Sequence, residues 1–179
     1  MLIIGIDPSI TKLGITLITG PIEQPEFKCQ RIIHPDKKAS SDERYEYMIT
    51  NVIRFIRATT PELVTVEYPF KIQGHAKVLV EVFGAIRYHC LRTQIPFLAI
   101  SQSHIKKFAT SSGNAEKSDM RMRAYKEFSL DLNEDEADSF WIALMGHVYL
   151  YGSKVKFRQD SIDDMIAKEN KVKKIKVKK

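Results

Sequence analysis

The chain is poor in cysteine and has no long apolar run. Only Cys29 and Cys90 occur among its 179 residues, and their spacing fits neither a disulfide framework nor a cysteine metal site. The longest apolar stretch, residues 140–152, is shorter than the roughly 20 residues that a membrane-spanning helix needs. The opening MLIIGID lacks the basic leader of a signal peptide. We therefore expect a cytoplasmic protein with reduced thiols and no membrane partner.

Glycine-rich phosphate loops of the common kind are missing as well. Residues 135–138 spell DEAD, but the acid of a helicase works with a G-x-x-x-x-G-K-[ST] loop, and no Gly-Lys pair with that spacing occurs. GIDPSITKLG (5–14) is similar to the first phosphate loop of actin-like sugar kinases, whose second, duplicated domain does not fit into this length. The length instead predicts one domain with a sizeable core.

What the chain does have is an uneven distribution of charge. Its formal net charge is +6, and the segment 153–179 holds ten Lys or Arg against four Asp or Glu. Residues 1–152 carry 18 charges of each sign and are formally neutral. We therefore predict a domain at 1–152 and a basic, partly disordered tail at 153–179 that binds polyanions. The alternative is a tail that only improves solubility.

Apolar periodicity predicts an α/β domain. Short apolar runs indicate strands at 1–6, 13–18, 26–32, 63–67 and 96–101. Helical spacing indicates helices at about 42–58, 75–93, 103–107, 115–128 and 135–150. The first three strands follow one another through Pro- and Gly-containing turns, whereas the later strands alternate with helices. This order predicts a mixed five-stranded sheet, with an antiparallel start, a parallel remainder and helices on both faces.

Carboxylates close two of the predicted strands and open the last helix. Asp7 ends the first strand and Glu67 the fourth, while Asp135 and Asp138 share one helical face. If the two strands are parallel neighbours, these acids meet at the edge where such sheets bind ligands. Oxygen-rich sites suit Mg²⁺ or Mn²⁺, and a pair of ions can support phosphodiester hydrolysis. The alternative is that the acids serve turns and the helix dipole. We assign that role to Asp131, Glu134 and Glu136.

Four segments together resemble the RuvC family of Holliday-junction resolvases, which have an RNase H-like fold. They are GIDPSITKLG (5–14), VEYPF (66–70), SGNAEKS (112–118) and DEADSFWIAL (135–144), and they run in the family's order over about residues 2–150. Ser9 and Thr16 stand where the family usually has glycine. These departures and the small size suggest a bacteriophage-type member, which would act in the cytoplasm of a bacterial host.

The resemblance implies roles for individual residues. Asp7, Glu67, Asp135 and Asp138 would be catalytic carboxylates that bind Mg²⁺ or Mn²⁺, two ions to a site. Lys117 would be the active-site lysine and would stabilise charge on the transferring phosphate. No small-molecule cofactor is implied. Further candidates for DNA contacts are Phe70, Lys71, Lys77, Lys106, Arg121 and Arg123. For Phe70 a core role remains open, and for the lysines a solvated charge.

The implied function is a homodimeric, metal-dependent endonuclease acting on branched DNA. The helix from about residue 75 would form the dimer interface, and a two-fold dimer suits paired, symmetric nicks in a four-way junction. The products would carry 5′-phosphate and 3′-hydroxyl ends. Two alternatives remain open: a related nuclease of the YqgF type that acts on RNA, and a junction-binding protein that does not cleave.

Overall fold

A computed structural model describes residues 2–9, 12–20, 26–69 and 76–177. The chain forms five strands and six helices within these ranges. The strands are β1 (Leu2–Asp7), β2 (Leu13–Thr19), β3 (Glu26–Ile33), β4 (Leu63–Glu67) and β5 (Phe97–Ile100). The helices are α1 (Ser41–Thr59), α2 (Ala76–Arg92), α3 (Gln102–Thr110), α4 (Lys117–Phe128), α5 (Glu134–Tyr151) and α6 (Lys156–Val177).

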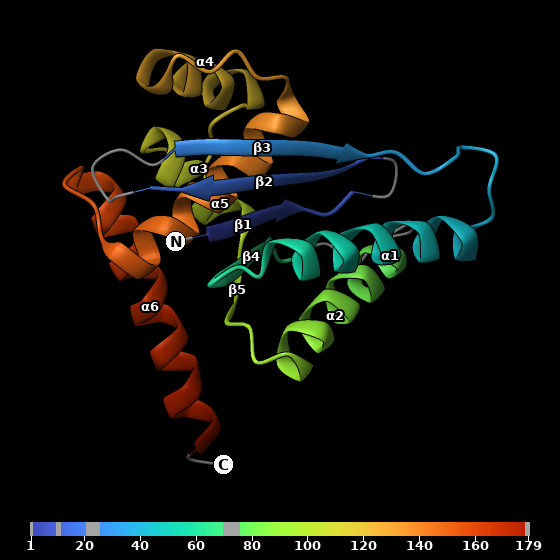
Figure 1. Ribbon diagram of the computed structural model, residues 1–179. Coiled ribbons are helices and arrows are strands. Elements are labelled where there is room, and N and C mark those ends of the chain that lie inside the picture. The colour runs from blue at the N-terminus through green and yellow to red at the C-terminus, as the bar shows by residue number, and fades with distance from the viewer. Residues whose placement is uncertain (1, 10–11, 21–25, 70–75, 178–179) are drawn as a thin grey trace.

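The five strands form one mixed sheet in the order β3-β2-β1-β4-β5 (Figure 1). β1 pairs antiparallel with β2, and β2 pairs antiparallel with β3. On its other side β1 runs parallel to β4, which runs parallel to β5. The predicted fold class is therefore confirmed, including the antiparallel start and the parallel remainder.

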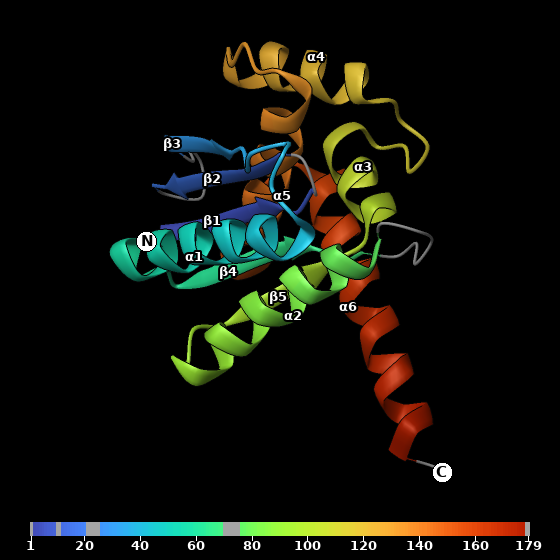
Figure 2. The same ribbon diagram turned by 90° about the vertical axis from the view of Figure 1, so that its right-hand side faces the viewer.

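Helices cover both faces of the sheet, because alternate residues of each buried strand point to opposite sides. Ile4 and Ile6 of β1 pack in a core with α1 and α2, whereas Ile3 packs in a second core with α3, α4 and α5. Figure 2 shows α1 and α2 on one side of the strands and α5 on the other. None of the helices in the described ranges is long and apolar enough to cross a membrane.

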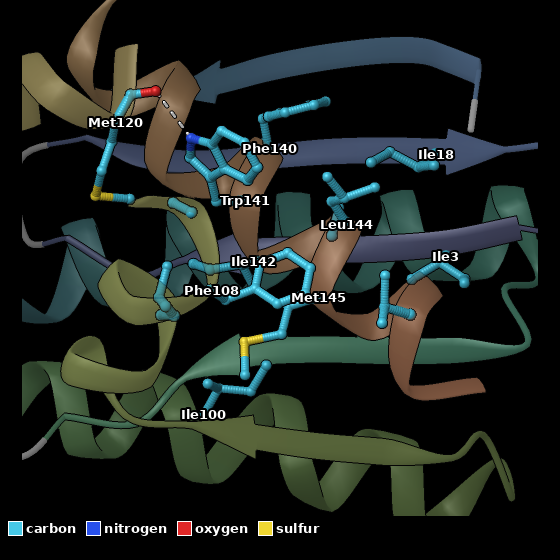
Figure 3. Packing of buried hydrophobic residues seen from close by; sticks show 14 of the residues in the cluster. Ile3, Ile18, Ile100, Phe108, Met120, Phe140, Trp141, Ile142, Leu144 and Met145 are labelled. Carbon is cyan, nitrogen blue, oxygen red and sulfur yellow. Dashed lines mark hydrogen bonds between the residues drawn. The ribbon is translucent and has the colours of Figure 1, made fainter. Parts of the chain in front are cut away.

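The second core is rich in aromatic rings and fixes the direction of α5. Trp141 is fully buried, and its indole Nε1 donates a hydrogen bond of 3.0 Å to the carbonyl of Met120 on α4 (Figure 3). Its ring meets Phe108 of α3 and Phe140 edge to face. α3 is longer than the predicted helix at 103–107, because Phe108 and Ala109 continue its buried side.

α6 is the element in which the structure differs most from the sequence-based expectation. Where the sequence predicts a partly disordered tail at 153–179, residues 156–177 form a helix, and its first half packs against α3 and α5. Arg158, Ser161, Ile162 and Met165 are buried there. The physical reason is an apolar face at helical spacing, which the high charge of the segment hides in a composition count. The boundaries of the two predicted domains stay a prediction.

Candidate active site

Two acids end adjacent parallel strands at one edge of the sheet. Ile6 of β1 lies opposite Val66 of β4, so the next residues, Asp7 and Glu67, leave the sheet side by side. Both side chains are partly buried. An acid at the end of an apolar strand is costly unless something balances its charge. The structure thus brings together the two strand-end acids that the sequence singled out.

The start of α5 brings two further acids to this edge. Asn133 caps the helix by accepting from the Glu136 amide at 3.0 Å, and the Glu136 carboxylate accepts from the Asn133 amide at 2.8 Å. This capping box fixes the first turn, which carries Asp135 and leads directly to Asp138. Glu136, predicted as a first-turn acid that serves the helix dipole, thus also takes part in the capping box. The charges of Asp138 and Asp135 both act to raise the pKa of Asp7, so the three carboxyl groups lie close enough to repel one another.

Two glycines let α5 lie directly on the strands. A Cβ atom on Gly5 of β1 would stand 2.3 Å from the Ala143 amide nitrogen and 2.5 Å from the Ser139 carbonyl oxygen. A Cβ atom on Gly14 of β2 would stand 2.9 Å from the Asp135 carbonyl oxygen. Any side chain at either position would push the helix off the sheet. Glycine therefore sets the spacing between the strand-end acids and the helix acids.

A buried polar network locks the same turn of α5 onto β2 and β3. The hydroxyls of Thr16 and Ser139 lie 2.8 Å apart within hydrogen-bond distance, and both residues are fully buried. Gln30 Nε2 donates to the Glu136 carbonyl at 2.7 Å. Sequence reasoning missed this network and noted Thr16 only as a departure from a glycine. The available signal was a set of polar residues on strands and a helix that are otherwise apolar.

Lysines reach three of the four acids. Lys117, the first residue of α4, forms an ion pair of 2.7 Å with Asp138. Lys12 pairs with Asp135 at 3.2 Å, a contact that the sequence did not reveal although Lys12 lies inside the first motif. The charge of Lys106 opposes the upward shift in the pKa of Glu67, so Lys106 also lies near this site. The two lysines predicted near the phosphate are thus both at the carboxylate edge.

Burial, together with crowding of like charges, raises the pKa values of three of the acids. Burial, then repulsion from Glu67 and Asp138, raises the pKa of Asp7 well above its usual value, although Lys117 acts against this. Burial and the charge of Asp138 raise the pKa of Glu67 to about 7. Burial likewise raises the pKa of Asp138, while the hydrogen bond from Lys117 opposes it. The ionised forms of these three acids are therefore costly at this edge unless a cation balances them.

Lys117 remains a fixed positive charge in this setting. Burial alone would lower its pKa, but the hydrogen bond to Asp138 and the charges of Asp138, Asp7 and Asp135 outweigh burial and raise it. The ammonium thus stays protonated at neutral pH and can act as an electrostatic partner rather than as a base.

The donor set fits a hard divalent cation. Over the ranges that the structure describes, no three His, Cys, Asp or Glu side chains stand as a ready-made metal cage. However, Asp138 and Asp135 each pair with a lysine ammonium group, whose positive charge occupies the place that a metal ion would take. Oxygen donors with excess negative charge are what Mg²⁺ and Mn²⁺ prefer. The residues predicted to bind metal therefore suit that role by chemistry.

The other predicted DNA contacts include two arginines that have partners elsewhere in the fold. Phe70 and Lys71 lie outside the described residues, and Lys77 belongs to the first turn of α2. Arg121 donates from Nε to the Leu132 carbonyl at 2.7 Å. Arg123 pairs with Glu127 and stacks over the Phe157 ring at 5.6 Å. These two arginines therefore already make contacts within the fold, and a DNA-binding role for Lys77, Arg121 or Arg123 stays a prediction.

Comparison with known proteins points to one family. A family model described as "Crossover junction endodeoxyribonuclease RuvC" matches residues 3–145, and α6 lies beyond this match. The crossover junction endodeoxyribonuclease RuvC of Synechococcus sp. (strain WH7803) is 30% identical over 151 residues, covering 82% of this chain and 97% of the relative. That of Parasynechococcus marenigrum (strain WH8102) is 31% identical over 153 residues, with the same coverage of 82% and 97%.

Solved structures show the same fold. Thermus thermophilus RuvC superimposes with a TM-score of 0.71 at 22% identity, covering 84% of this chain and 95% of that one. T. thermophilus RuvC in complex with Holliday junction substrate gives a TM-score of 0.70 at 20% identity, covering 90% and 97%. The bacteriophage-type origin and the cytoplasmic location stay predictions.

Proposed function

This chain belongs to the crossover junction endodeoxyribonuclease RuvC family, and from this premise we propose that it is a homodimeric endonuclease that nicks Holliday junctions and related branched DNA. The observation that carries the proposal is the convergence of Asp7, Glu67 and Asp138 with Lys117 at one sheet edge. Family membership gives the reaction class. The convergence of these groups supports the assignment of that reaction to this edge.

The carboxylates would hold the metal. Asp7, Glu67, Asp135 and Asp138 supply oxygen donors whose mutual repulsion favours a bound cation. Bound there, one or two Mg²⁺ or Mn²⁺ ions would supply an activated water and stabilise the leaving oxygen of a phosphodiester. The rigid start of α5, fixed by its capping box and by the Thr16–Ser139 contact, keeps the helix acids in position for this role.

The lysines would act on the substrate itself. Lys117 stays charged and stands beside Asp138, where it can stabilise negative charge on the phosphate that is cut. Lys106, whose charge reaches Glu67, would bind the phosphate beside that carboxylate. Preorganised charges of this kind typically contribute about 10²–10³-fold to a rate.

A dimer would present two such sites to one junction. α2 exposes large apolar side chains, with Tyr88 66% and Leu91 67% accessible, as expected of a helix that meets a second copy. A two-fold axis would place the two carboxylate edges symmetrically, so that two strands of like polarity are nicked in a four-way junction. Nicking would leave 5′-phosphate and 3′-hydroxyl ends.

The test is nicking of a synthetic four-way junction with Mg²⁺ by the unaltered protein and by Asp7→Asn. We expect Asp7→Asn to lose at least about 10³-fold in rate, because the amide cannot balance a metal ion. The matched control is Asp131→Asn, which removes an exposed acid in the same acidic stretch and should leave the rate unchanged. Equal rates for Asp7→Asn and the unaltered protein would contradict the metal assignment.

The choice of substrate separates the proposal from its alternatives. The unaltered protein should nick the four-way junction faster than linear duplex or structured RNA of equal length. Preferential cleavage of RNA would favour a nuclease of the YqgF type. Tight binding to the junction without nicking, over a series of Mg²⁺ and Mn²⁺ concentrations, would favour a junction-binding protein without catalytic activity.

A further inference from the structure

Charge changes abruptly along α6. Residues 153–167 contain three Lys or Arg and three Asp or Glu, whereas residues 168–179 contain seven Lys and one Glu. The second stretch therefore carries a formal charge of +6, which equals the net charge of the whole chain. We call residues 156–167 the docked half of α6 and residues 168–177 its basic half. The two halves need separate physical explanations.

The docked half is fixed by one buried arginine. Arg158 is only 4% exposed, and its guanidinium lies 5.1–5.7 Å from the centres of four aromatic rings. These rings, which we call the aromatic box, belong to Phe108, Phe128, Trp141 and Phe157. The guanidinium also bonds to the Glu127 carboxylate of α4. A buried cation that is paired and enclosed by rings holds its helix in one orientation.

Contacts along α3 give the direction in which α6 runs. Asp164 pairs with Lys107 at 2.5 Å, and one turn later Lys168 Nζ lies 3.4 Å from Nε2 of His104. α6 therefore runs antiparallel to α3, toward the start of α3. The structure also shows α6 extending past the sheet and beyond the rest of the fold (Figures 1 and 2).

The start of α3 lies at the carboxylate edge. Ser101, which precedes α3, follows Ile100 at the end of β5, and Ile100 lies opposite Glu67 of β4. Lys106, two residues after His104, influences the pKa of Glu67. The basic half of α6 thus begins beside the candidate active site and leads away from it.

We propose that α6 supports one duplex arm of the DNA substrate. The aromatic box fixes the direction of the helix, and the helix contacts the DNA backbone without sequence preference. Its ten basic-half residues span about 15 Å at about 1.5 Å per residue. Duplex DNA carries one charge per about 1.7 Å of its axis, so a helix of this length can meet several phosphates. The inference rests on the proposed function, because the arm that enters the active site is the one that passes α6.

Charge complementarity favours a DNA arm over other occupants. Five of the ten residues of the basic half are lysines, and such a row of positive charges suits a sugar–phosphate backbone contacted from outside. A tail that merely attracts polyanions needs no fixed orientation, yet Arg158 and its box provide one. The fixed direction of α6 is therefore what distinguishes this proposal from a flexible basic tail.

The first experiment removes the charge and keeps the helix. In the full-length protein, Lys171, Lys173, Lys174 and Lys176 are each changed to Gln. Binding to a four-way junction is measured in EDTA over a series of salt concentrations. Each phosphate contact contributes about 0.9 to the slope of log affinity against log salt, so we expect a slope that is smaller by about 2–4. We also expect affinity to fall on the order of 10- to 100-fold at physiological salt.

A matched control removes the same amount of charge at other exposed positions. The residues changed to Gln are Arg54, Arg57, Arg92 and Lys126, all exposed. This control should keep the slope within about 1 of the unaltered value. If both quadruple variants lose the same slope, net charge alone explains binding, and the proposal is overturned. An unchanged slope in the α6 variant, or a change in its oligomeric state, also overturns it.

The second experiment keeps every charge but no longer fixes the direction of the basic half of α6. A Gly-Gly-Ser insertion after Ala167 leaves all lysines in place but uncouples the basic half from the docked half. We expect affinity for the junction to fall about 5- to 10-fold, because the preorganised orientation is lost. Arg158→Lys should have the same effect and should expose α6 to faster proteolysis. Unaltered affinity in the insertion variant would show that α6 is a flexible basic tail.

Failure of this proposal can be told apart from failure of the proposed function. Nicking with Mg²⁺ is measured for each variant at saturating protein. We expect single-turnover rates within about 3-fold of the unaltered protein, because the carboxylates are unchanged. If the unaltered protein nicks nothing, the proposed function fails, whereas the salt slopes still test α6 as a DNA support.

Discussion

Charge is buried in two regions of this fold, the carboxylate edge and the aromatic box, and the two regions balance it differently. At the carboxylate edge, burial and mutual repulsion raise the pKa values of Asp7, Glu67 and Asp138, and Lys117 offsets only part of the excess. In the aromatic box, burial lowers the pKa of Arg158, but Glu127 opposes the shift and four rings face the cation.

The difference separates a charge kept for binding from a charge kept for packing. The acids are left with a surplus that a cation from solution can satisfy, which makes the edge receptive but unstable without one. The charge of Arg158 is paired with Glu127 and enclosed by rings within the chain, so its burial contributes to the docking of α6 and not to ligand binding. If this contrast is right, substitutions in the two regions should change different measured quantities.

The largest expected effect comes from removing the internal cation of the carboxylate edge. Lys117→Met should lower the single-turnover rate of junction nicking about 10²–10³-fold, because a fixed charge beside the phosphate is lost. Junction affinity should change less than about 3-fold, since one phosphate contact among many is removed. Lys126→Met, on the exposed side of the same helix, is the control and should keep both quantities. Similar losses in both variants would contradict a special role for Lys117.

The next effect should appear in stability and not in rate. Arg158→Met should lower the free energy of unfolding by about 2–3 kcal/mol, because it breaks a buried ion pair and leaves the Glu127 carboxylate with Arg123 as its remaining arginine partner. Urea unfolding followed by circular dichroism measures this. Arg54→Met, at an exposed position, should stay within about 0.5 kcal/mol of the unaltered protein. A fall in the nicking rate under conditions in which the variant stays folded would place Arg158 in the catalytic machinery and contradict the contrast.

At the carboxylate edge, removing an acid should stabilise the metal-free fold. The pKa of Glu67 is about 7 in the fold against an ordinary value of 4.5, so the folded state binds more protons between these pH values. Stability from this group is therefore lost as the pH rises from about 4.5 to 7. In EDTA at pH 8, Glu67→Gln should gain about 1–3 kcal/mol over the unaltered protein, and the gain should vanish near pH 4.5.

Thermal melting at pH 5 and pH 8 measures this gain, which should be accompanied by the loss of Mg²⁺-dependent nicking. The control Asp131→Asn removes an exposed acid of the same acidic stretch and should not gain stability. A protein whose melting temperature rises with pH over this interval would contradict the surplus of charge at the edge.

The smallest expected effect concerns the network that supports α5. Thr16→Val keeps the shape but removes the hydroxyl that faces Ser139, and it should cost about 1 kcal/mol of unfolding free energy. The nicking rate should fall less than about 10-fold, because the capping box still fixes the helix start. Thr19→Val, at the end of the same strand, serves as the control. An unchanged free energy of unfolding in Thr16→Val would show that the Thr16–Ser139 contact does not help to hold α5 on the sheet.

The features that could be predicted from the sequence are those with a local pattern. Asp7 and Glu67 each end an apolar run, and Asp135 and Asp138 share a helical face, so short stretches were enough to single them out. The sheet followed from the order of strands and helices, because connection rules allow few arrangements. The resemblance to a known family then supplied Lys117.

The features that could not be predicted depend on contacts between distant segments. Lys12 and Asp135, like Thr16 and Ser139, are 123 residues apart, and no local pattern couples them. α6 was missed for another reason. The buried residues Arg158 and Ile162 are scattered among acids and lysines, so the composition of the segment indicates solvent exposure although one face is apolar.

The contact of α5 with Gly5 has a consequence for the mechanical precision of the site. Gly5 stands two residues before Asp7, and the helix backbone that it touches, at Ser139, directly follows Asp138. Backbone therefore rests on backbone between the strand acid and the helix acid. Side chains in a packed core can change rotamer, but atoms in direct contact have no such slack. The separation between the backbones that carry the two acids is thus held as by a solid spacer, and thermal motion of the surrounding helices should hardly change it.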